Sequence, residues 1–420
     1  MARVLVCCYL IALLVRPQDW FGPFIGLPTG FVITLAMFVG GLVNYLSDRS
    51  RYETPHNRLL PIYILVIFAS TLINTDFGNA MDQAVTFGKR AVLFFSIVWL
   101  VNTRERAYFT VWSFVLILLF LSFQAVLQAQ TGLSWGGQTV MPGYAEIRVR
   151  WHGDWDGPNS FALLFVLGAA MTMEFIFGPY GAGTRLWAVA LSSMYFVAIF
   201  LTNSRGAVLA LLGMTALYFK DRFSKPVAIT LAAVAILGIV AFGPSRMSEI
   251  NTKESSAHER SWAWEQGLTM LRQSPVLGVG RGEFHRRVDS GLLAHNNYVQ
   301  NFAELGLTGF LIFTALLWFT WRGGYLMSRL PPTNDTRLPS LGRMITGAVA
   351  GYCLVTFFVV MELDILYFML GLCTAMYGVA RREVPELPVL RLTRWDVSMV
   401  CGVAFAVVAA IWLISVKSIV

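Results

Sequence analysis

The chain has 420 residues, of which 56% are hydrophobic and only 13% are charged, and its mean hydropathy is +0.61. A soluble globule of this size needs more polar surface, so the composition excludes that class and favours a protein that lies in a bilayer. The net charge of +8 comes without a domain-sized basic surface. We therefore expect it to mark topology and to attract anionic membrane lipids, with no nucleic-acid partner.

Apolar runs of roughly 15 to 24 residues recur along the chain, which is about the length that crosses ~30 Å of hydrocarbon as a helix. They predict an all-α integral membrane protein, a polytopic bundle of about 12 transmembrane helices. The thirteen candidate spans are residues 2–15, 24–46, 59–73, 85–101, 108–129, 159–177, 185–201, 205–219, 226–243, 297–321, 342–361, 363–380 and 396–416. The first run is short and precedes Arg16-Pro17 rather than a cleavage site, so we interpret it as retained, and the number is twelve if it does not fully cross.

The spans divide the chain into amino-terminal transmembrane helices (1–243), a large periplasmic loop region with amphipathic helices (244–296) and carboxy-terminal transmembrane helices (297–420). Lys and Arg in short connections are held on the cytoplasmic side. Every second connection is basic, and these carry Arg49, Arg51, Arg58, Arg104, Arg106, Lys220, Arg222, Lys225, Arg322, Arg329, Arg337, Arg343, Arg381, Arg382, Arg391 and Arg394. The connections at 74–84 and 362–364 and the long loops 130–158 and 244–296 then face outward, and the amino terminus faces inward.

The outward loops nevertheless contain many arginines, which breaks the charge rule at one face only. They are Arg148, Arg150, Arg205, Arg246, Arg260, Arg272, Arg281, Arg286 and Arg287. Binding of an anionic, lipid-linked substrate at the membrane surface would offset their cost there. The alternative is that they are rim charges paired with nearby glutamates, and the sequence leaves both interpretations open.

Three polar patterns precede spans that run from outside to inside. They are Arg150-Trp151-His152-Gly153 with Gly157-Pro158-Asn159, then Thr202-Asn203-Ser204-Arg205, and then Ala294-His295-Asn296-Asn297. Pro158 is typical of a first helical position, and the Asn-Ser pair before Arg205 is a capping pair. The free N–H groups and the positive dipole ends of all three helices would face one surface, an arrangement that favours a phosphate or pyrophosphate.

Asn297, Asn301 and Glu304 lie at i, i+4 and i+7 and therefore share one helix face. A polar stripe inside a span faces protein or water. It either lines a pocket or forms interhelical hydrogen bonds that hold the bundle together. The further candidates for the pocket lining are Asn296, His152 and Arg281.

The loop 244–296 is expected to be ordered. Ser255 and Ser256 offer a cap for an amphipathic helix on the outer interface, which ends at Ser274-Pro275. The glycines of Gly278-Val279-Gly280-Arg281-Gly282 predict a tight turn, and they are no dinucleotide fingerprint because no strand–glycine–helix context surrounds them. The sequence contains no Walker motif, HExxH or paired Asp cluster on this face, which predicts metal-independent chemistry without a cofactor.

Three motifs in this order resemble the O-antigen ligase superfamily of Gram-negative inner membranes, which also includes O-antigen polymerases. They are Ser204-Arg205-Gly206, the outward loop with Glu259-Arg260-Ser261-Trp262 and Pro275-Val276-Leu277-Gly278-Val279-Gly280, and His295-Asn296-Asn297 to Glu304-Leu305-Gly306. The resemblance lies in the motifs of the second half of the chain and, for the first half, in architecture only.

The resemblance implies a metal-independent glycosyltransferase of GT-C type whose active site faces the periplasm. It would move a glycan from undecaprenyl pyrophosphate to a hydroxyl, which in ligases belongs to lipid A-core. By match, Arg205 and Arg260 would bind the pyrophosphate, as would Arg150, and His295 would act at the reacting hydroxyl. Guanidinium groups and helix termini are suited to a departing pyrophosphate, and histidine to the role of base.

Alternatives remain within and outside this superfamily. A polymerase or a protein O-glycosylation ligase would use the same pyrophosphate site with another acceptor. A flippase or transporter predicts charged or glycine-broken helices near the midplane and an internal repeat, and the sequence indicates neither.

Overall fold

The computed structural model describes residues 1–47, 54–142, 146–220, 230, 255–288, 291–331 and 337–417. Within these ranges all regular secondary structure is helical, apart from an isolated bridge between Leu133 and Thr139. Nine helices of the described part are long and apolar enough to cross a membrane. They are α3 (Thr29–Ser47), α4 (His56–Asn74), α5 (Phe77–Leu100), α6 (Arg104–Thr131), α7 (Pro158–Phe177), α8 (Ala182–Leu201), α12 (Asn297–Ser328), α13 (Arg337–Val355) and α15 (Arg394–Lys417).

Other predicted spans are shorter or more polar. The first consists of α1 (Ala2–Leu10) and a π-helical turn, η1 (Ile11–Val15), and α9 (Arg205–Phe219) has the predicted bounds. The helix α14 (Asp364–Glu383) has charged ends and is not among the nine candidate membrane spans. The helix α11 (Ser255–Gln273) is the one expected in the long loop. Apart from residue 230, the predicted span 226–243 lies outside the described residues, so a total of 12 or 13 spans stays a prediction.

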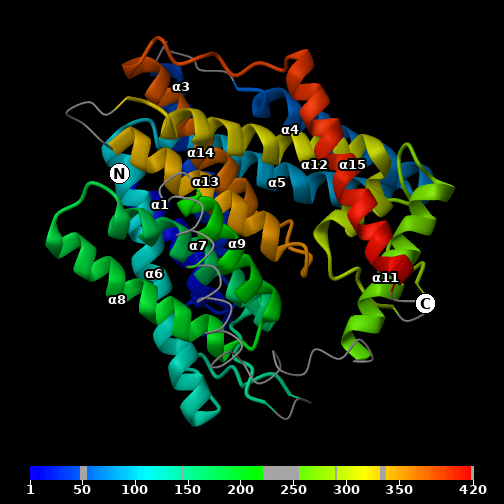
Figure 1. Cartoon of the computed structure of the whole chain (residues 1–420), viewed down its shortest axis with the longest axis horizontal. Coiled ribbons are helices and arrows are strands. Elements are labelled where there is room, and N and C mark those ends of the chain that lie inside the picture. The colour runs from blue at the N-terminus through cyan, green and yellow to red at the C-terminus, as the bar shows by residue number, and fades with distance from the viewer. Residues whose placement is uncertain are drawn as a thin grey trace.

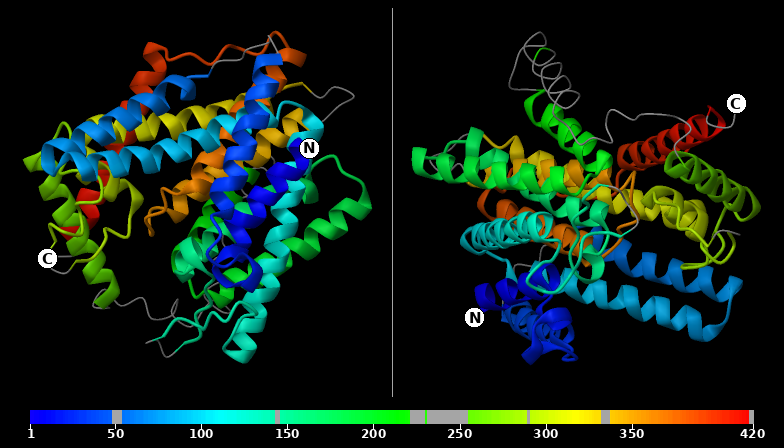
Figure 2. Two further views of the ribbon diagram at one scale, coloured as in Figure 1. Left: turned by 180° about the vertical axis from the view of Figure 1, so that it is seen from behind. Right: turned by 90° about the horizontal axis from the view of Figure 1, so that it is seen from below.

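The basic connections gather at one end of the bundle, as the charge pattern predicted. Arg104 at the start of α6 forms an ion pair of 3.0 Å with Glu383 at the end of α14, and Arg382 donates to the carbonyl of Asn102. Figure 1 places α11 and the end of α6 away from this basic end, and Figure 2 shows the same separation from behind. The bundle therefore has a basic end and an opposite end, which carries α11.

The interior of the bundle is formed by α7, α12, α13 and α14, while other helices lie at its periphery. Nearly every residue of α7 is buried. In contrast, α3, α8 and α15 expose large apolar side chains such as Phe31, Trp187 and Phe405. Apolar side chains on the outside of a helical bundle are what contact with lipid requires.

The long helix α12 is broken at Gly306, whose φ of 63° and ψ of −166° are not helical. The segment Pro275–Gly280, which follows α11, lies against the break. The N–H groups of Leu307 and Thr308 donate to the carbonyls of Pro275 and Val276, and those of Val279 and Gly280 donate to the carbonyls of Ala303 and Glu304. The interpretation that no glycine-broken helix is present was therefore wrong. The segment that bonds to the break precedes it in the chain by about thirty residues, so local sequence patterns could not indicate the break.

Several helix ends differ from the sequence prediction, among them the end of α13 and the start of α5. The helix α13 stops at Val355 rather than at 361, because the carbonyl of Thr356 accepts from the Asn297 N–H at 2.9 Å instead of continuing a helix. The helix α5 begins at Phe77, after Asp76 caps it, so the outward connection predicted at 74–84 contains only two residues.

Candidate functional site

The start of α9 has the cap that the sequence predicted. The Ser204 hydroxyl accepts from the Ala207 N–H at 3.3 Å, which makes Arg205 the first helical residue. The preceding residue, Asn203, is left-handed with φ of 51°, and its side-chain amide donates to the carbonyl of Ile147 at 2.9 Å. The residue before the cap of α9 is therefore hydrogen-bonded to the outward loop between α6 and α7.

The start of α12 repeats this order of conformations. Asn296 caps the helix by accepting from the N–H groups of Tyr298 at 2.9 Å and Val299 at 3.1 Å. His295, the residue before the cap, is left-handed with φ of 48°. Such a conformation costs a non-glycine residue about 1–3 kcal/mol and persists only where its surroundings impose it. The backbone conformation thus fixes the direction of the Cα–Cβ bond of His295.

The segment between α13 and α14, Thr356–Leu363, brings the two helix starts together. Its Thr356 carbonyl accepts from the first N–H of α12, and its Phe358 lies so close to Gly206 that a Cβ there would meet it at 2.8 Å. Its Phe357 packs edge-to-face on Trp264 of α11 with the ring centroids 5.3 Å apart. The elements α9, α11 and α12, which carry Arg205, Arg260 and His295, therefore meet around one short segment.

His295 lies beside the first turns of α11. The Trp264 indole donates to the carbonyl of Ala294 at 3.0 Å, which fixes the residue before the histidine. Burial lowers the pKa of His295, the Arg260 guanidinium lowers it further, and the Glu259 carboxylate opposes this shift. At neutral pH the imidazole is therefore uncharged and has a nitrogen lone pair that can accept a proton.

The first predicted helix start is correct, since α7 begins at Pro158, but the side chains before it lie elsewhere. Arg150 pairs with Asp156 at 2.9 Å, and its guanidinium also donates to the carbonyl of Thr139. His152 stacks on Trp20 near the amino-terminal segment, with the ring centroids 6.4 Å apart. Arg150 thus contacts residues of the loop between α6 and α7, and His152 contacts the amino-terminal segment.

Arg148 is a residue that the sequence-based choice of site passed over. It is 7% exposed, and its guanidinium donates to the carbonyl of Thr202 at 3.4 Å, two residues before the cap of α9. The pattern Arg148-Val149-Arg150 in an outward loop was the available signal. It could not distinguish which of the two arginines turns toward α9.

The polar stripe on α12 forms interhelical contacts, as one of its two interpretations expected. Asn301 donates to the Tyr63 hydroxyl at 2.7 Å and to Glu362 at 2.9 Å, and all three side chains are buried. The Arg281 guanidinium lies 3.1 Å from Glu362 and 3.4 Å from Glu304. Glu362, which the sequence placed in a turn without a role, therefore shares Arg281 with the stripe.

Other members of the expected pocket lining also serve the fold. The Asn297 side-chain oxygen accepts from the Met361 N–H at 3.3 Å, which joins the start of α12 to the segment Thr356–Leu363. Asn296 is the buried helix cap. Within the part of the chain that the structure describes, their amide nitrogens are buried without a hydrogen-bond partner. These donors are available to a ligand, so a role in the pocket lining stays a prediction.

Comparison with known proteins supports the resemblance carried by the motifs. Residues 188–314 match the family model described as O-antigen ligase. This range contains α9, α11 and the first half of α12, and with them Arg205, Arg260 and His295. The resemblance to the O-antigen ligase superfamily is confirmed for this part of the chain.

Two curated proteins are also similar. The exopolysaccharide production protein ExoQ of Rhizobium meliloti is 28% identical over 179 residues, which are 38% of this chain and 40% of that protein. An uncharacterized protein of Haemophilus influenzae is 25% identical over 144 residues, 26% of this chain and 36% of that protein. The chain thus matches well under half the length of these relatives.

Proposed function

We propose that this chain is an O-antigen ligase of the bacterial inner membrane, which transfers a glycan from undecaprenyl pyrophosphate to lipid A-core at the periplasmic face. One observation carries the proposal. Two helix starts, each with a left-handed residue followed by a polar cap, meet at Thr356–Leu363. One bears Arg205 and the other bears His295. Both lie within the range that matches the O-antigen ligase model.

The leaving group in this reaction is a pyrophosphate, whose charge must be neutralised as it departs. Arg205 stands in the first turn of α9, where free N–H groups and the helix dipole add to its guanidinium. Arg260 approaches from α11. We propose that Arg205 and Arg260 stabilise the departing oxygens in place of a metal ion. Arg150 is paired with Asp156 in the loop between α6 and α7, so its predicted role at the pyrophosphate requires this pair to open.

The attacking group is a hydroxyl of the acceptor, which must lose its proton. His295 is suited to accept it because burial and Arg260 keep the imidazole neutral. The hydroxyl oxygen then bonds to the anomeric carbon, and the bond from this carbon to the pyrophosphate oxygen breaks. The electron pair leaves with undecaprenyl pyrophosphate, and the proton stays on His295 until solvent removes it.

The test is transfer by the purified full-length protein in lipid nanodiscs. Lipid-linked glycan is added with and without lipid A-core, in the presence or absence of a chelator. We expect release of undecaprenyl pyrophosphate and glycosylated lipid A-core only when both substrates are present, at a rate that the chelator does not change. Donor cleavage without dependence on the acceptor, or loss of transfer on chelation that a divalent metal restores, would contradict the proposal.

The related polymerase is the second candidate, because one relative is named for exopolysaccharide production. It would join two lipid-linked glycans, and the same assay without lipid A-core would then yield longer lipid-linked products. The transporter alternative gains little from the break in α12. The backbone groups around Gly306 are bonded to the segment Pro275–Gly280, whereas a transporter leaves such groups facing its substrate.

A further inference from the structure

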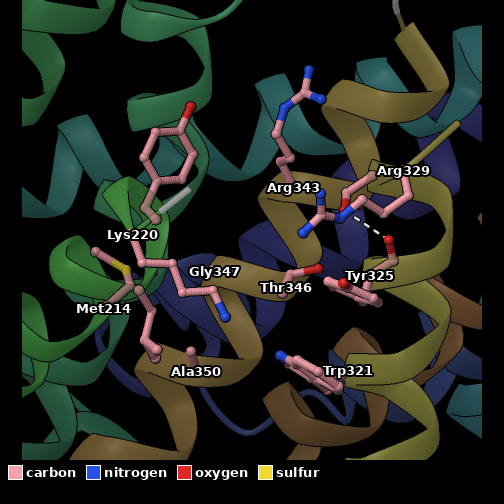
Figure 3. Close-up of a pocket in the computed structure, with 12 residues that line it drawn as sticks. Met214, Lys220, Trp321, Tyr325, Arg329, Arg343, Thr346, Gly347 and Ala350 are labelled. Carbon is pink, nitrogen blue, oxygen red and sulfur yellow. Dashed lines mark hydrogen bonds between the residues drawn. The ribbon is translucent and has the colours of Figure 1, made fainter. Parts of the chain in front are cut away.

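A second site lies at the basic end of the bundle, where α9 and α12 end and α13 begins. A pocket of about 200 Å³ is open between these helices. Figure 3 shows Lys220 and Arg329 pointing into it from α9 and α12, and Arg343 on α13 beside it. Of the described residues that line the pocket, none is acidic.

The three cations differ in what they contact. Both nitrogens of the Arg343 fork are bonded to the Glu174 carboxylate, at 2.9 and 2.7 Å, so this charge is neutralised inside the protein. Lys220 and Arg329 are exposed. Both side chains line the pocket and can reach a ligand that enters it from outside.

An aromatic pair forms one side of the pocket. Trp321 and Tyr325 stack with their centroids 5.2 Å apart and an interplanar angle of 11°, and the Arg329 guanidinium lies 5.1 Å from the Tyr325 ring centre. Trp and Tyr gather at the level of lipid headgroups, and Arg and Lys at the same level bind lipid phosphates. Cations on an aromatic wall thus place this pocket at the membrane interface.

An apolar cavity of about 590 Å³ continues from the pocket along α9, α12 and α13. Leu217, Trp321 and Ala350 line both, so the two spaces adjoin. The cavity extends to Phe357 and Phe358 near the opposite end, and Val403 and Val407 of α15 form its outer side. A ligand that fills both spaces must have an anionic group at one end, which contacts the cations, and a long hydrocarbon chain at the other end.

We propose that this composite site binds an anionic glycerophospholipid of the leaflet at the basic end. Its phosphate lies between Lys220 and Arg329, and an acyl chain follows the cavity toward Phe357. A free phosphate would leave the apolar cavity without an occupant. A polyprenyl pyrophosphate donor would need its phosphates at the opposite end of the same helices. This inference goes beyond the proposed function, and only the exclusion of the prenyl donor rests on it.

The experiment measures thermal unfolding of the full-length protein in phosphatidylcholine nanodiscs with increasing phosphatidylglycerol. We compare the wild type with the double variant Lys220→Gln/Arg329→Gln. A matched control, Arg391→Gln/Arg394→Gln, removes two exposed cations that do not line the pocket. Each cation contributes about 1 kcal/mol to binding of an anionic lipid, so half-maximal stabilisation of the pocket variant should need about 25-fold more phosphatidylglycerol. The control should resemble the wild type.

A further variant tests the acyl chain. Ala350→Trp fills the junction of the two spaces and leaves both cations in place, so it should also lose the stabilisation by phosphatidylglycerol. Its unfolding temperature in pure phosphatidylcholine shows whether it folds. Wild-type lipid dependence in a folded Ala350→Trp variant would overturn the assignment of the cavity.

Three other results would overturn the proposal. Equal losses in the pocket variant and in the control would reduce the effect to general surface charge. Equal stabilisation by inorganic phosphate would make the pocket a simple anion site. Stronger stabilisation by undecaprenyl phosphate than by phosphatidylglycerol, lost in the pocket variant, would assign the site to the prenyl carrier.

Discussion

Gly278 and Gly306 lie backbone against backbone, one in the segment after α11 and the other in the break of α12. A Cβ added to Gly278 would fall 2.5 Å from the Gly306 nitrogen, and one added to Gly306 would fall 2.4 Å from the Val276 carbonyl. Both glycines also have positive φ, 69° and 63°. These two positions therefore decide whether the segment Pro275–Gly280 of the loop 244–296, called the outer loop below, fits into the helix break.

Replacement of either glycine by alanine should destabilise this joint. The conformation alone costs about 1–3 kcal/mol, and the clash is with backbone atoms that cannot turn aside. We expect a lower unfolding temperature for Gly278→Ala and Gly306→Ala, together with faster proteolysis of the outer loop. Gly88→Ala is the matched control, because it lies inside α5 and, among the described residues, no atom beyond its own helix backbone lies within 4 Å of the new methyl group. Equal effects at all three positions would contradict the backbone contact.

Lysine in place of Arg205 or Arg260 keeps the charge but loses the planar fork. If both arginines bind the pyrophosphate, kcat/KM for the donor should fall about tenfold to a hundredfold in each variant, and further with alanine. Arg286→Lys is the control, since this arginine is 57% exposed and pairs with its neighbour Glu283. Wild-type activity in both Lys variants would leave these arginines as topology or rim charges.

Asparagine at position 295 separates the backbone from the chemistry. Asn tolerates the left-handed conformation better than other residues, so His295→Asn should be as stable as the wild type. It has no basic nitrogen, so glycan transfer should be lost while donor-lipid binding remains. His295→Ala should lose transfer as well and should unfold at a lower temperature. Full transfer by the Asn variant would remove proton abstraction from the mechanism.

The pH profile should respond to the two neighbours of His295 in opposite directions. Because the neutral imidazole is the active form, transfer is lost as pH falls through its pKa. Arg260 lowers this pKa, so Arg260→Gln should move the acid limb of kcat/KM to higher pH, whereas Glu259→Gln should move it to lower pH. Shifts in the same direction in both variants, or none in either, would exclude His295 as the titrating base.

The orientation can be tested with single cysteines in a cysteine-free background. Arg286→Cys in the outer loop should react with an impermeant thiol reagent added from the periplasmic side. Arg391→Cys, in an exposed position between α14 and α15, should react only after permeabilisation. The reverse pattern would place the basic end outside and move the proposed reaction to the cytoplasm.

Local chemistry predicted the parts of the site that depend on neighbours in sequence. The cap at Ser204 and the proline at the start of α7 were identified because their signals lie within one turn of the helix. The end of α13 was missed because the carbonyl of Thr356 bonds to Asn297, about sixty residues away. An apolar run in the sequence does not show at which residue hydrogen bonds to another segment replace those within the helix.

The polar stripe of α12 shows the same limit. Helical periodicity placed Asn301 and Glu304 on one face, which is correct. It could not show that this face meets Glu362 from the segment before α14 and Arg281 from the outer loop. Burial of these groups depends on three segments that pack together, and their pairing is a property of the assembled bundle.

The break in α12 also decides which part of this chain can be exchanged with a relative. A graft of the outer loop alone would bring a foreign segment against the native residues 303–308, and four backbone hydrogen bonds would depend on their fit. A graft of residues 274–308 carries both sides of the contact and leaves it intact. For the design of chimeras, the segment that follows α11 and the first twelve residues of α12, 297–308, thus form a single unit of exchange, although one part is a loop and the other a helix.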